Sequence, residues 1–492
     1  MPELWELSVE ETARRVRARE ASAAEVLEAC LDRTARVEPL VGAYLEVFED
    51  EARAGAAEVD RRIAAGEDPG PLAGVPMALK DNLNLEGHAL TCASRVLAGY
   101  VAPYTATAVE RLLAAGAVPL GRANMDEFAM GSSCESSAYQ PTRNPWDLTR
   151  VPGGSSGGPA AAVAAGSVPL AFGSDTGGSI RQPAALCGLV GIKPTYARVS
   201  RYGLVAFASS TDQIGPITRN VRDSALALQV IAGVDPNDAT SSDRPVDDYL
   251  ERIEEGIAGL RVAVIREVEA AGLGGDVARN WRESLDRLAA AGAEIVEVSV
   301  PSISAAIAAY YVVATSEASA NLARFDGVRY GFRSPEADNL ADLYFESRGE
   351  GFGPEVKRRI MLGTFALSSG YYEAYYGRAR GVLERMRREL DAAFEQADLV
   401  VTPTSPTPAF RLGERTEDPL AMYLSDIFTT PANLVGLPAF AIPSGADSEG
   451  LPLSLQIMGR PFDEATVFRA ARAFEREVAW VVAPGFRGTE AG

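Results

Sequence analysis

Histidine is almost absent from this sequence, and lysine is scarce. The 492 residues include one histidine, His88. A Ser–His–Asp triad would therefore have a single candidate base, and a metal site that needs two histidines is excluded. Only three of the 47 basic residues are lysines (Lys80, Lys193 and Lys357), and the other 44 are arginines. Lysine, unlike arginine, can lose its proton near neutral pH when it is buried, so each lysine is a candidate for chemistry.

Cysteine pairs and long apolar runs are also missing. The four cysteines lie far apart without a CxxC pair, which indicates free thiols in a reducing compartment rather than a disulfide framework or zinc site. No 18-residue apolar run occurs, and the acidic start of the chain has no apolar targeting segment. We therefore expect a cytoplasmic protein that does not enter a membrane.

Basic residues do not exceed acidic ones. Lys and Arg number 47 against 67 Asp and Glu, a net charge of −20. This balance argues against extensive nucleic-acid contact by this chain alone. The length would suit about three ordinary domains, but no repeat or clear linker divides the chain.

The pattern of apolar residues predicts an α/β fold. Capping boxes at Ser8 and Ser22 predict an N-terminal helical segment over 1–65, packed on a core domain of 66–492. Beyond residue 70, short apolar runs alternate with helices rich in small residues. We therefore predict a single large domain whose central, mixed but mostly parallel β-sheet is covered by helices on both faces. A helix over 369–396 carries an apolar stripe expected to pack in the core: Tyr372, Tyr375, Tyr376, Ala379, Leu383, Met386, Leu390 and Phe394.

Residues 153–158 (GGSSGG) form an unusual glycine-rich stretch before a predicted helix. It could be a flexible loop, a phosphate cradle or a nucleophile loop. No lysine follows it, so the P-loop pattern is not met. The pattern G-x-S-x-G occurs twice, centred on Ser155 or Ser156, but the single histidine lies upstream, which argues against a histidine-dependent hydrolase.

A second glycine-rich turn follows an apolar strand at 173–181 (GSDTGGSIR). The N–H groups of Thr176, Gly177 and Gly178 precede Ser179 and could form an oxyanion hole. Glycine suits this position because a side chain would block the substrate carbonyl. The alternative is a tight structural turn.

Lys80 follows a run without polar side chains and precedes Asp81. A lysine at the end of a buried strand is costly unless it is paired or neutral. It could form an ion pair with Asp81 or another carboxylate. It could instead be a neutral amine that takes a proton from a serine.

Lys80, Ser155 and Ser179, spaced by 75 and 24 residues, resemble the Ser–cis-Ser–Lys triad of the amidase signature family. Within that family, several stretches resemble the A subunits of tRNA-dependent amidotransferases: 124–131, 139–146, 201–216, 317–331 and 426–438. The sequence departs from the family pattern at Pro159 and at Cys134, and neither residue belongs to the triad.

The resemblance implies a glutamine-hydrolysing subunit with the amidase signature fold. Ser179 would attack the glutamine side-chain amide, and Ser155, on a cis peptide, would pass the proton to neutral Lys80. The N–H groups before Ser179 would hold the oxyanion. The implied substrate contacts are Arg359 for the α-carboxylate, Asp426 for the α-ammonium, and Tyr310, Met130 and Gly131, with Arg358 and Tyr311 as adjacent alternatives.

The resemblance also implies partners. A B subunit would use ATP and Mg²⁺, bind most of the tRNA and receive ammonia, and a small C subunit would complete a heterotrimer. This chain would need no cofactor or metal. Whether Glu-tRNA(Gln), Asp-tRNA(Asn) or both are amidated stays open. The alternative function is a stand-alone amidase that hydrolyses small or aryl amides.

Overall fold

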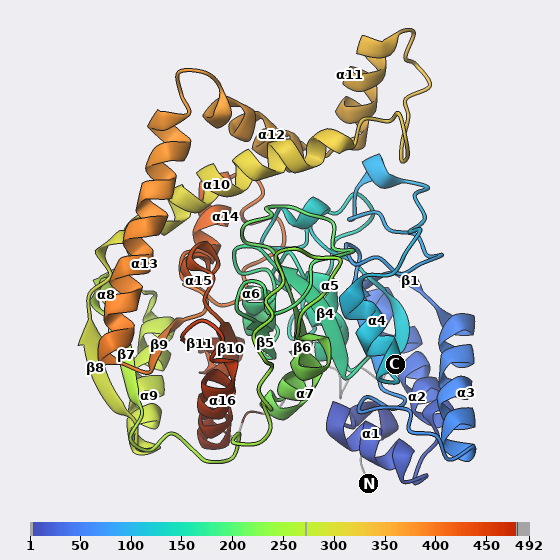
Figure 1. Cartoon of the computed structure of the whole chain (residues 1–492), viewed down its shortest axis with the longest axis vertical. Coiled ribbons are helices and arrows are strands. Elements are labelled where there is room, and N and C mark those ends of the chain that lie inside the picture. The colour runs from blue at the N-terminus through green and yellow to red at the C-terminus, as the bar shows by residue number, and fades with distance from the viewer. Residues whose placement is uncertain (1–2, 271–272, 479, 481–492) are drawn as a thin grey trace.

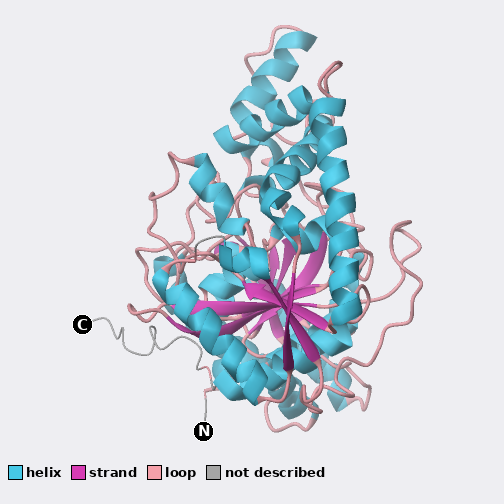
Figure 2. Cartoon of the chain, turned by 90° about the vertical axis from the view of Figure 1, so that its left-hand side faces the viewer, coloured by secondary structure: helices cyan, strands magenta, loops and turns pink. Residues whose placement is uncertain are grey.

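The computed structural model describes residues 3–270, 273–478 and 480. Within these ranges one sheet of 11 strands crosses the molecule, and Figure 2 shows its strands fanning out between helices. Such a fan is the twist expected of a large sheet. The spatial order of the strands is β1 (Tyr44–Val47), β3 (Val118–Ala123), β2 (Pro76–Lys80), β4 (Leu170–Asp175), β6 (Gln213–Thr218), β5 (Val190–Lys193), β10 (Ala439–Ala446), β11 (Pro452–Met458), β9 (Leu399–Pro403), β7 (Arg261–Ile265) and β8 (Glu294–Val298).

Strand directions correct one part of the fold prediction. The mixed sheet, the helices on both faces and the single α/β unit are confirmed, but the sheet is not mostly parallel. Among its neighbouring pairs, β2 runs parallel to β3 and β4, and β7 runs parallel to β8 and β9. The other six pairs are antiparallel. Strands covered on both faces have continuous apolar runs in either direction, so the sequence pattern could not separate the two.

The first 65 residues contain α1 (Val9–Arg17), α2 (Ala23–Val41) and α3 (Glu49–Ala64). The capping box at Ser22 is present, and the Ser8 hydroxyl accepts from the Glu11 N–H at 3.1 Å. Strand β1, which the sequence pattern did not predict, pairs with β3 at the edge of the sheet. Side chains of α2 and α3 share a hydrophobic cluster with the sheet and α5 (Gly157–Ala164). The division at residue 65 stays a prediction.

Helix α12 lies beyond one end of the sheet and α11 projects past it, whereas α13 runs down from this end alongside β7 and β9 (Figure 1). Helix α10 packs against both α12 and α13. The helices after α3, other than α5, are α4 (Thr107–Ala114), α6 (Arg181–Leu186), α7 (Val221–Ile231), α8 (Arg266–Ala270), α9 (Gly275–Ala290), α10 (Ala306–Asn321), α11 (Leu340–Gly351), α12 (Pro354–Leu367), α13 (Arg378–Gln396), α14 (Pro419–Tyr423), α15 (Thr430–Val435) and α16 (Glu464–Val478). None of the helices in the described ranges is long and apolar enough to cross a membrane.

The helix predicted over 369–396 is shorter than expected. A π-helical turn, Glu373–Gly377, precedes α13. The stripe from Ala379 to Phe394 is buried as predicted. Core packing is wrong for Tyr372 and Tyr375, which are 45% and 43% exposed, because this turn lies beyond the end of the sheet.

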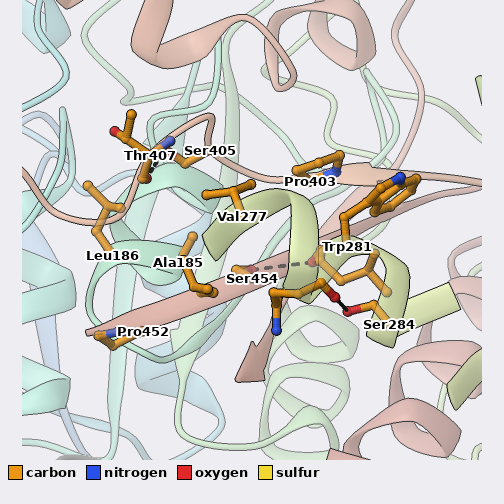
Figure 3. A pocket seen from close by; sticks show the side chains of 13 residues that line it. Ala185, Leu186, Val277, Trp281, Ser284, Pro403, Ser405, Thr407, Pro452 and Ser454 are labelled. Carbon is orange, nitrogen blue, oxygen red and sulfur yellow. Dashed lines mark hydrogen bonds between the residues drawn. The ribbon is translucent and has the colours of Figure 1, made fainter. Parts of the chain in front are cut away.

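A small cavity lies between α6, α9, β9 and β11 (Figure 3). Its volume is about 10 Å³, and the Ser284 hydroxyl at its wall donates to the Asn280 carbonyl at 2.7 Å. That space holds at most one water molecule, so this cavity is not a substrate site. The four cysteines are unpaired, as the sequence predicted, and the structure shows that all four are buried.

Candidate active site

Lys80, the last residue of β2, is fully buried among serine hydroxyls. Its Nζ donates to Ser155 Oγ at 2.7 Å, to Ser156 Oγ at 2.9 Å and to Ser174 Oγ at 3.0 Å. None of these partners is a carboxylate. The amine is therefore solvated by neutral hydroxyl groups, which tolerate the uncharged form.

Asp81 does not neutralise Lys80, so the ion pair considered from the sequence is wrong. The Asp81 carboxylate instead accepts from Arg122 Nη1 at 2.9 Å and from the Ala93 N–H at 2.9 Å. Thr91 donates to the same carboxylate through its N–H, at 3.0 Å, and through its hydroxyl. Consecutive side chains along an extended backbone point to opposite sides, which explains why the two neighbours in sequence are separated.

Burial lowers the pKa of Lys80 from 10.5 to about 7, although the charges of Asp126, Asp175 and Asp212 act in the opposite direction. About half of the amine is then neutral at pH 7. A neutral amine beside a serine hydroxyl can accept a proton without a histidine.

The sheet brings the two glycine-rich loops to Lys80. Strands β2 and β4 are parallel neighbours, so their carboxyl ends, Lys80 and Asp175, meet at one edge. The loop before α5 crosses this edge with a cis peptide between Gly154 and Ser155. The Ser156 N–H donates to the Ser179 carbonyl at 3.0 Å, which ties the two loops together. Lys80, Ser155 and the loop of Ser179 thus converge, which is the arrangement that the resemblance to the amidase signature family implies.

The loop before Ser179 offers N–H groups, but not all three of those predicted. The Gly178 N–H already donates to Asp175 Oδ1 at 2.9 Å, so it is not available to a substrate. Among the described residues, the N–H groups of Thr176, Gly177 and Ser179 have no acceptor. The Thr176 hydroxyl donates to Asp212 Oδ1 at 2.7 Å and so fixes the start of the loop. The free N–H groups are those an oxyanion would require.

A buried ion pair that the sequence analysis gave no role holds this loop. Asp175 and Arg181 are both fully buried, with Asp175 Oδ1 2.9 Å from Arg181 Nη2. The Ile180 N–H donates to Asp175 Oδ2 at 3.1 Å. Burial alone would raise the pKa of Asp175, but the Arg181 charge and hydrogen bonds lower it to about 2. The carboxylate therefore stays charged and anchors both sides of the nucleophile loop.

A cavity of about 540 Å³ has Met130, Gly131, Ser132 and Arg359 in its lining. Asp126 and Ser133 of the same lining lie against Gly154, so the cavity reaches the back of the loop before α5. Met130 and Gly131 therefore line this cavity, and their role as substrate contacts stays a prediction. The Ser132 hydroxyl donates to Asp426 Oδ2 at 2.5 Å. The other carboxylate oxygen of Asp426 is buried and has no hydrogen-bond partner in the described structure. An unpaired buried carboxylate oxygen calls for a donor, which a bound substrate could supply.

The structure distinguishes Arg359 from Arg358. The Arg359 side chain is 3% exposed and its Nε lies 2.8 Å from Glu355 Oε1. Within the described ranges its two terminal nitrogens have no hydrogen-bond partner, so they can receive an anion. The Arg358 side chain is 43% exposed and forms an ion pair with Glu355. Both arginines line the cavity, but Arg359 is the one that is buried there with unpaired terminal nitrogens among the described residues.

Tyr310 and Tyr311 both contribute to the site, in different ways. A Cβ added at Gly177 would lie 2.6 Å from the Tyr310 ring, so Tyr310 packs directly on the nucleophile loop. Tyr311 stacks on Tyr423 with ring centroids 3.9 Å apart. The Arg359 guanidinium lies 5.1 Å from the Tyr311 ring, a distance typical of cation–π contact. Tyr311 thus supports Arg359, and Tyr310 covers the loop.

Charges around the cavity depend on one another. Burial raises the pKa of Asp426 to about 7, while the Ser132 hydroxyl and the nearby Arg359 charge lower it. Glu355 accepts from Arg359 and, at 2.8 Å, from the Tyr423 hydroxyl. Glu355 was missed, although its i, i+4 spacing from Arg359 is a signal for such a pair. No group of three or more His, Cys, Asp or Glu is placed to hold a metal in the described part of the chain.

Lys80, with its lowered pKa, contacts Ser155 beside a glycine-rich loop that has free N–H groups and carries Ser179. This arrangement is typical of an enzyme that hydrolyses amides. The chain belongs to the amidase family, whose model matches residues 25–468. The A subunit of the glutamyl-tRNA(Gln) amidotransferase of Moorella thermoacetica is 58% identical over 474 residues, covering 96% of this chain and 97% of that protein. The resemblance proposed from the sequence is thus confirmed.

Two solved structures have the same fold. The crystal structure of the glutamyl-tRNA(Gln) amidotransferase A subunit from Thermotoga maritima is 45% identical, with a TM-score of 0.81 over 97% of this chain and 96% of that chain. A bacterial aryl acylamidase of the amidase signature family is 26% identical, with a TM-score of 0.87 over 98% of both chains. The fold therefore serves more than one substrate class, and the site must decide between them.

Proposed function

We propose that this chain is the glutamine-hydrolysing subunit of a tRNA-dependent amidotransferase. It would release ammonia from glutamine and supply it to a partner protein that amidates Glu-tRNA(Gln), Asp-tRNA(Asn) or both. The identity to the A subunits of glutamyl-tRNA(Gln) amidotransferases over nearly the whole chain supports this proposal.

The two side chains that distinguish between the candidate substrates are Arg359 and Asp426. The unpaired guanidinium nitrogens of Arg359 suit an α-carboxylate, and the unpaired Oδ1 of Asp426 suits an α-ammonium. The two side chains are close enough for the Arg359 charge to lower the pKa of Asp426. An amino acid carries both groups on one carbon, whereas a simple aryl amide carries neither. This pair supports glutamine over the alternative amidase function.

The chemistry follows from the position of Lys80. Ser179 Oγ attacks the glutamine side-chain carbonyl, and its proton passes through Ser155 Oγ to the neutral Lys80 amine, 2.7 Å away. The N–H groups of Gly177 and Ser179 stabilise the oxyanion. The protonated network then gives a proton to the leaving nitrogen, and ammonia departs. Water cleaves the acyl-enzyme by the reverse proton path and releases glutamate.

The remaining partners belong to the same proposal. ATP and Mg²⁺ would be used by the B subunit, which would also hold most of the tRNA, and the C subunit would complete the heterotrimer. This chain would need neither a metal nor a cofactor of its own. A reducing cytoplasm would suit its four unpaired cysteines.

The test is glutamine hydrolysis by the purified chain, alone and with the B and C subunits, measured as ammonia release. We expect hydrolysis that rises when the partners are added, and covalent labelling of Ser179 by a serine-directed sulfonyl fluoride. Efficient hydrolysis of aryl amides by the isolated chain, with no turnover of glutamine in either state, would instead establish a stand-alone amidase.

A further inference from the structure

Residues 361–377 are almost free of charge. The segment reads MLGTFALSSGYYEAYYG, with Glu373 as its one charged residue, in a chain that is 23% charged. It covers the second half of α12 and the turn that leads into α13. A segment of this composition normally belongs to a protein core.

This segment nevertheless presents its large side chains to water. Met361 is 66% exposed, and the other members of the set are 37–46% exposed. We call this set the aromatic patch, and it consists of Met361, Leu362, Phe365, Leu367, Tyr371, Tyr372 and Tyr375. The Phe365 ring lies 4.5 Å from the Tyr371 ring and 5.6 Å from the Tyr375 ring. Phe365, Tyr371 and Tyr375 therefore form one cluster of rings within the patch.

Helix α12 has the polarity opposite to that of an ordinary surface helix. Its buried face includes Arg359 and Gly363, and a Cβ at Gly363 would collide with the Thr315 carbonyl of α10. Its outer face carries Met361, Leu362 and Phe365 at helical spacing. The close packing at Gly363 fixes which face is turned outward, so these apolar residues cannot rotate into the core.

The aromatic patch adjoins the cavity through the same helix. Arg358 lines the cavity, and it lies one turn before Met361 on the outer face of α12. A protein seated on the patch would therefore also lie against the mouth of the cavity. Aromatic residues and methionine are enriched at protein interfaces, whereas charged residues are depleted there.

The proposed function identifies the occupant. Ammonia that escapes into water near neutral pH is protonated to ammonium and loses its nucleophilic lone pair. The enzyme that consumes ammonia must therefore cover the site that releases it. A second copy of this chain could not use the ammonia, and a chain of net charge −20 would be repelled by an anionic membrane.

We infer that the aromatic patch is the docking surface for the ammonia-consuming partner protein, which would meet it with an apolar, uncharged surface. This inference rests on the proposed function, because it takes the identity of the occupant from the fate of ammonia. It adds the location of the contact and its chemical character.

Phe365→Asp and Met361→Asp test the inference in the full-length chain, with Leu113→Asp as the matched control. Leu113 on α4 is 36% exposed and lies outside the patch. Binding to the purified B and C subunits would be measured by sedimentation velocity. We expect both patch variants to bind at least about 30-fold more weakly and Leu113→Asp to bind like the wild type. Labelling of Ser179 by the sulfonyl fluoride should be equal in all chains, which shows that the variants are folded.

Three results would overturn the inference. The first is unchanged binding of the folded patch variants. The second is a wild-type dimer that Phe365→Asp converts to a monomer without loss of partner binding. The third is binding of the wild-type chain, but not of Phe365→Asp, to phosphatidylcholine vesicles, with partner binding unaffected. If partner binding depends on the patch but the complex does not hydrolyse glutamine, the proposed function fails and the docking surface stands.

Discussion

Replacing Lys80 by arginine keeps a positive charge but removes the ability to accept a proton. Burial lowers the pKa of Lys80 from 10.5 to about 7, which corresponds to roughly 5 kcal/mol against the ammonium form. At pH 7 about half of the amine is neutral, compared with about 0.03% for an ordinary lysine. Burial therefore increases the neutral fraction of Lys80, which is the form that can accept a proton, by about a thousandfold. Arginine keeps its proton under the same conditions.

We therefore expect Lys80→Arg to lower kcat/KM for glutamine by about 10²–10⁴-fold. We expect Lys80→Ala to lower it by the same amount. In the wild type, kcat at saturating glutamine, where Asp426 is already paired with the substrate, should rise about tenfold per pH unit below pH 7 and level off above about pH 8, because only the neutral amine accepts a proton. The assay is ammonia release between pH 5.5 and 9, with thermal unfolding to confirm that each variant is folded. A folded Lys80→Arg chain within tenfold of the wild-type rate, or a flat wild-type profile below pH 7, would refute this assignment.

Three further substitutions test the rest of the site. Arg359→Lys should raise KM for glutamine about 10–100-fold, because the two-pronged contact is lost, while Arg358→Lys should change it less than threefold; equal effects would contradict the assignment. Gly177→Ala should lower kcat by at least about 100-fold, since its Cβ would lie 2.6 Å from the Tyr310 ring and shift the oxyanion loop, and an unchanged kcat would show that this loop tolerates movement. Asp175→Asn should lower the free energy of unfolding in urea by about 3–5 kcal/mol, because it leaves a buried arginine unpaired, and a loss below 1 kcal/mol would argue against that role.

The scarcity of lysine drew attention to Lys80, but it would not have been sufficient alone to distinguish Lys80 from the other buried lysine. Lys193 is also fully buried, and burial lowers its pKa to about 7. Its Nζ donates to the Pro194 carbonyl at 2.7 Å and reaches no serine. Burial in an apolar strand is readable from the sequence in both cases. What separates the two lysines is which loops the sheet brings to each strand end, and that depends on strand order.

The sequence could not predict which of two adjacent arginines, Arg358 or Arg359, is buried at the site, and the reason is related. Arg358 and Arg359 have the same chemistry, and only the rotation of α12 decides which of them is buried. Gly363 sets that rotation by its close approach to α10. Likewise, the sequence predicted free N–H groups before Ser179, but not that Asp175 would occupy that of Gly178. Each of these outcomes depends on a contact between segments far apart in the chain.

Two buried aspartates of the site, Asp175 and Asp426, differ in whether the fold itself provides a positively charged partner. Asp175 has Arg181 beside it, and the Arg181 charge and hydrogen bonds lower its pKa to about 2, so it is charged at neutral pH. Asp426 accepts from Ser132 on one oxygen, its other oxygen has no hydrogen-bond partner among the described residues, and burial raises its pKa to about 7. The first carboxylate has its partner, Arg181, within the fold and holds the loop that carries Ser179. The second has no built-in cation in direct contact, so an incoming ammonium group would provide the missing partner and favour its charged form. A ligand that brings a carboxylate to Arg359 and an ammonium to Asp426 would therefore complete both charges at once, which a neutral amide cannot do.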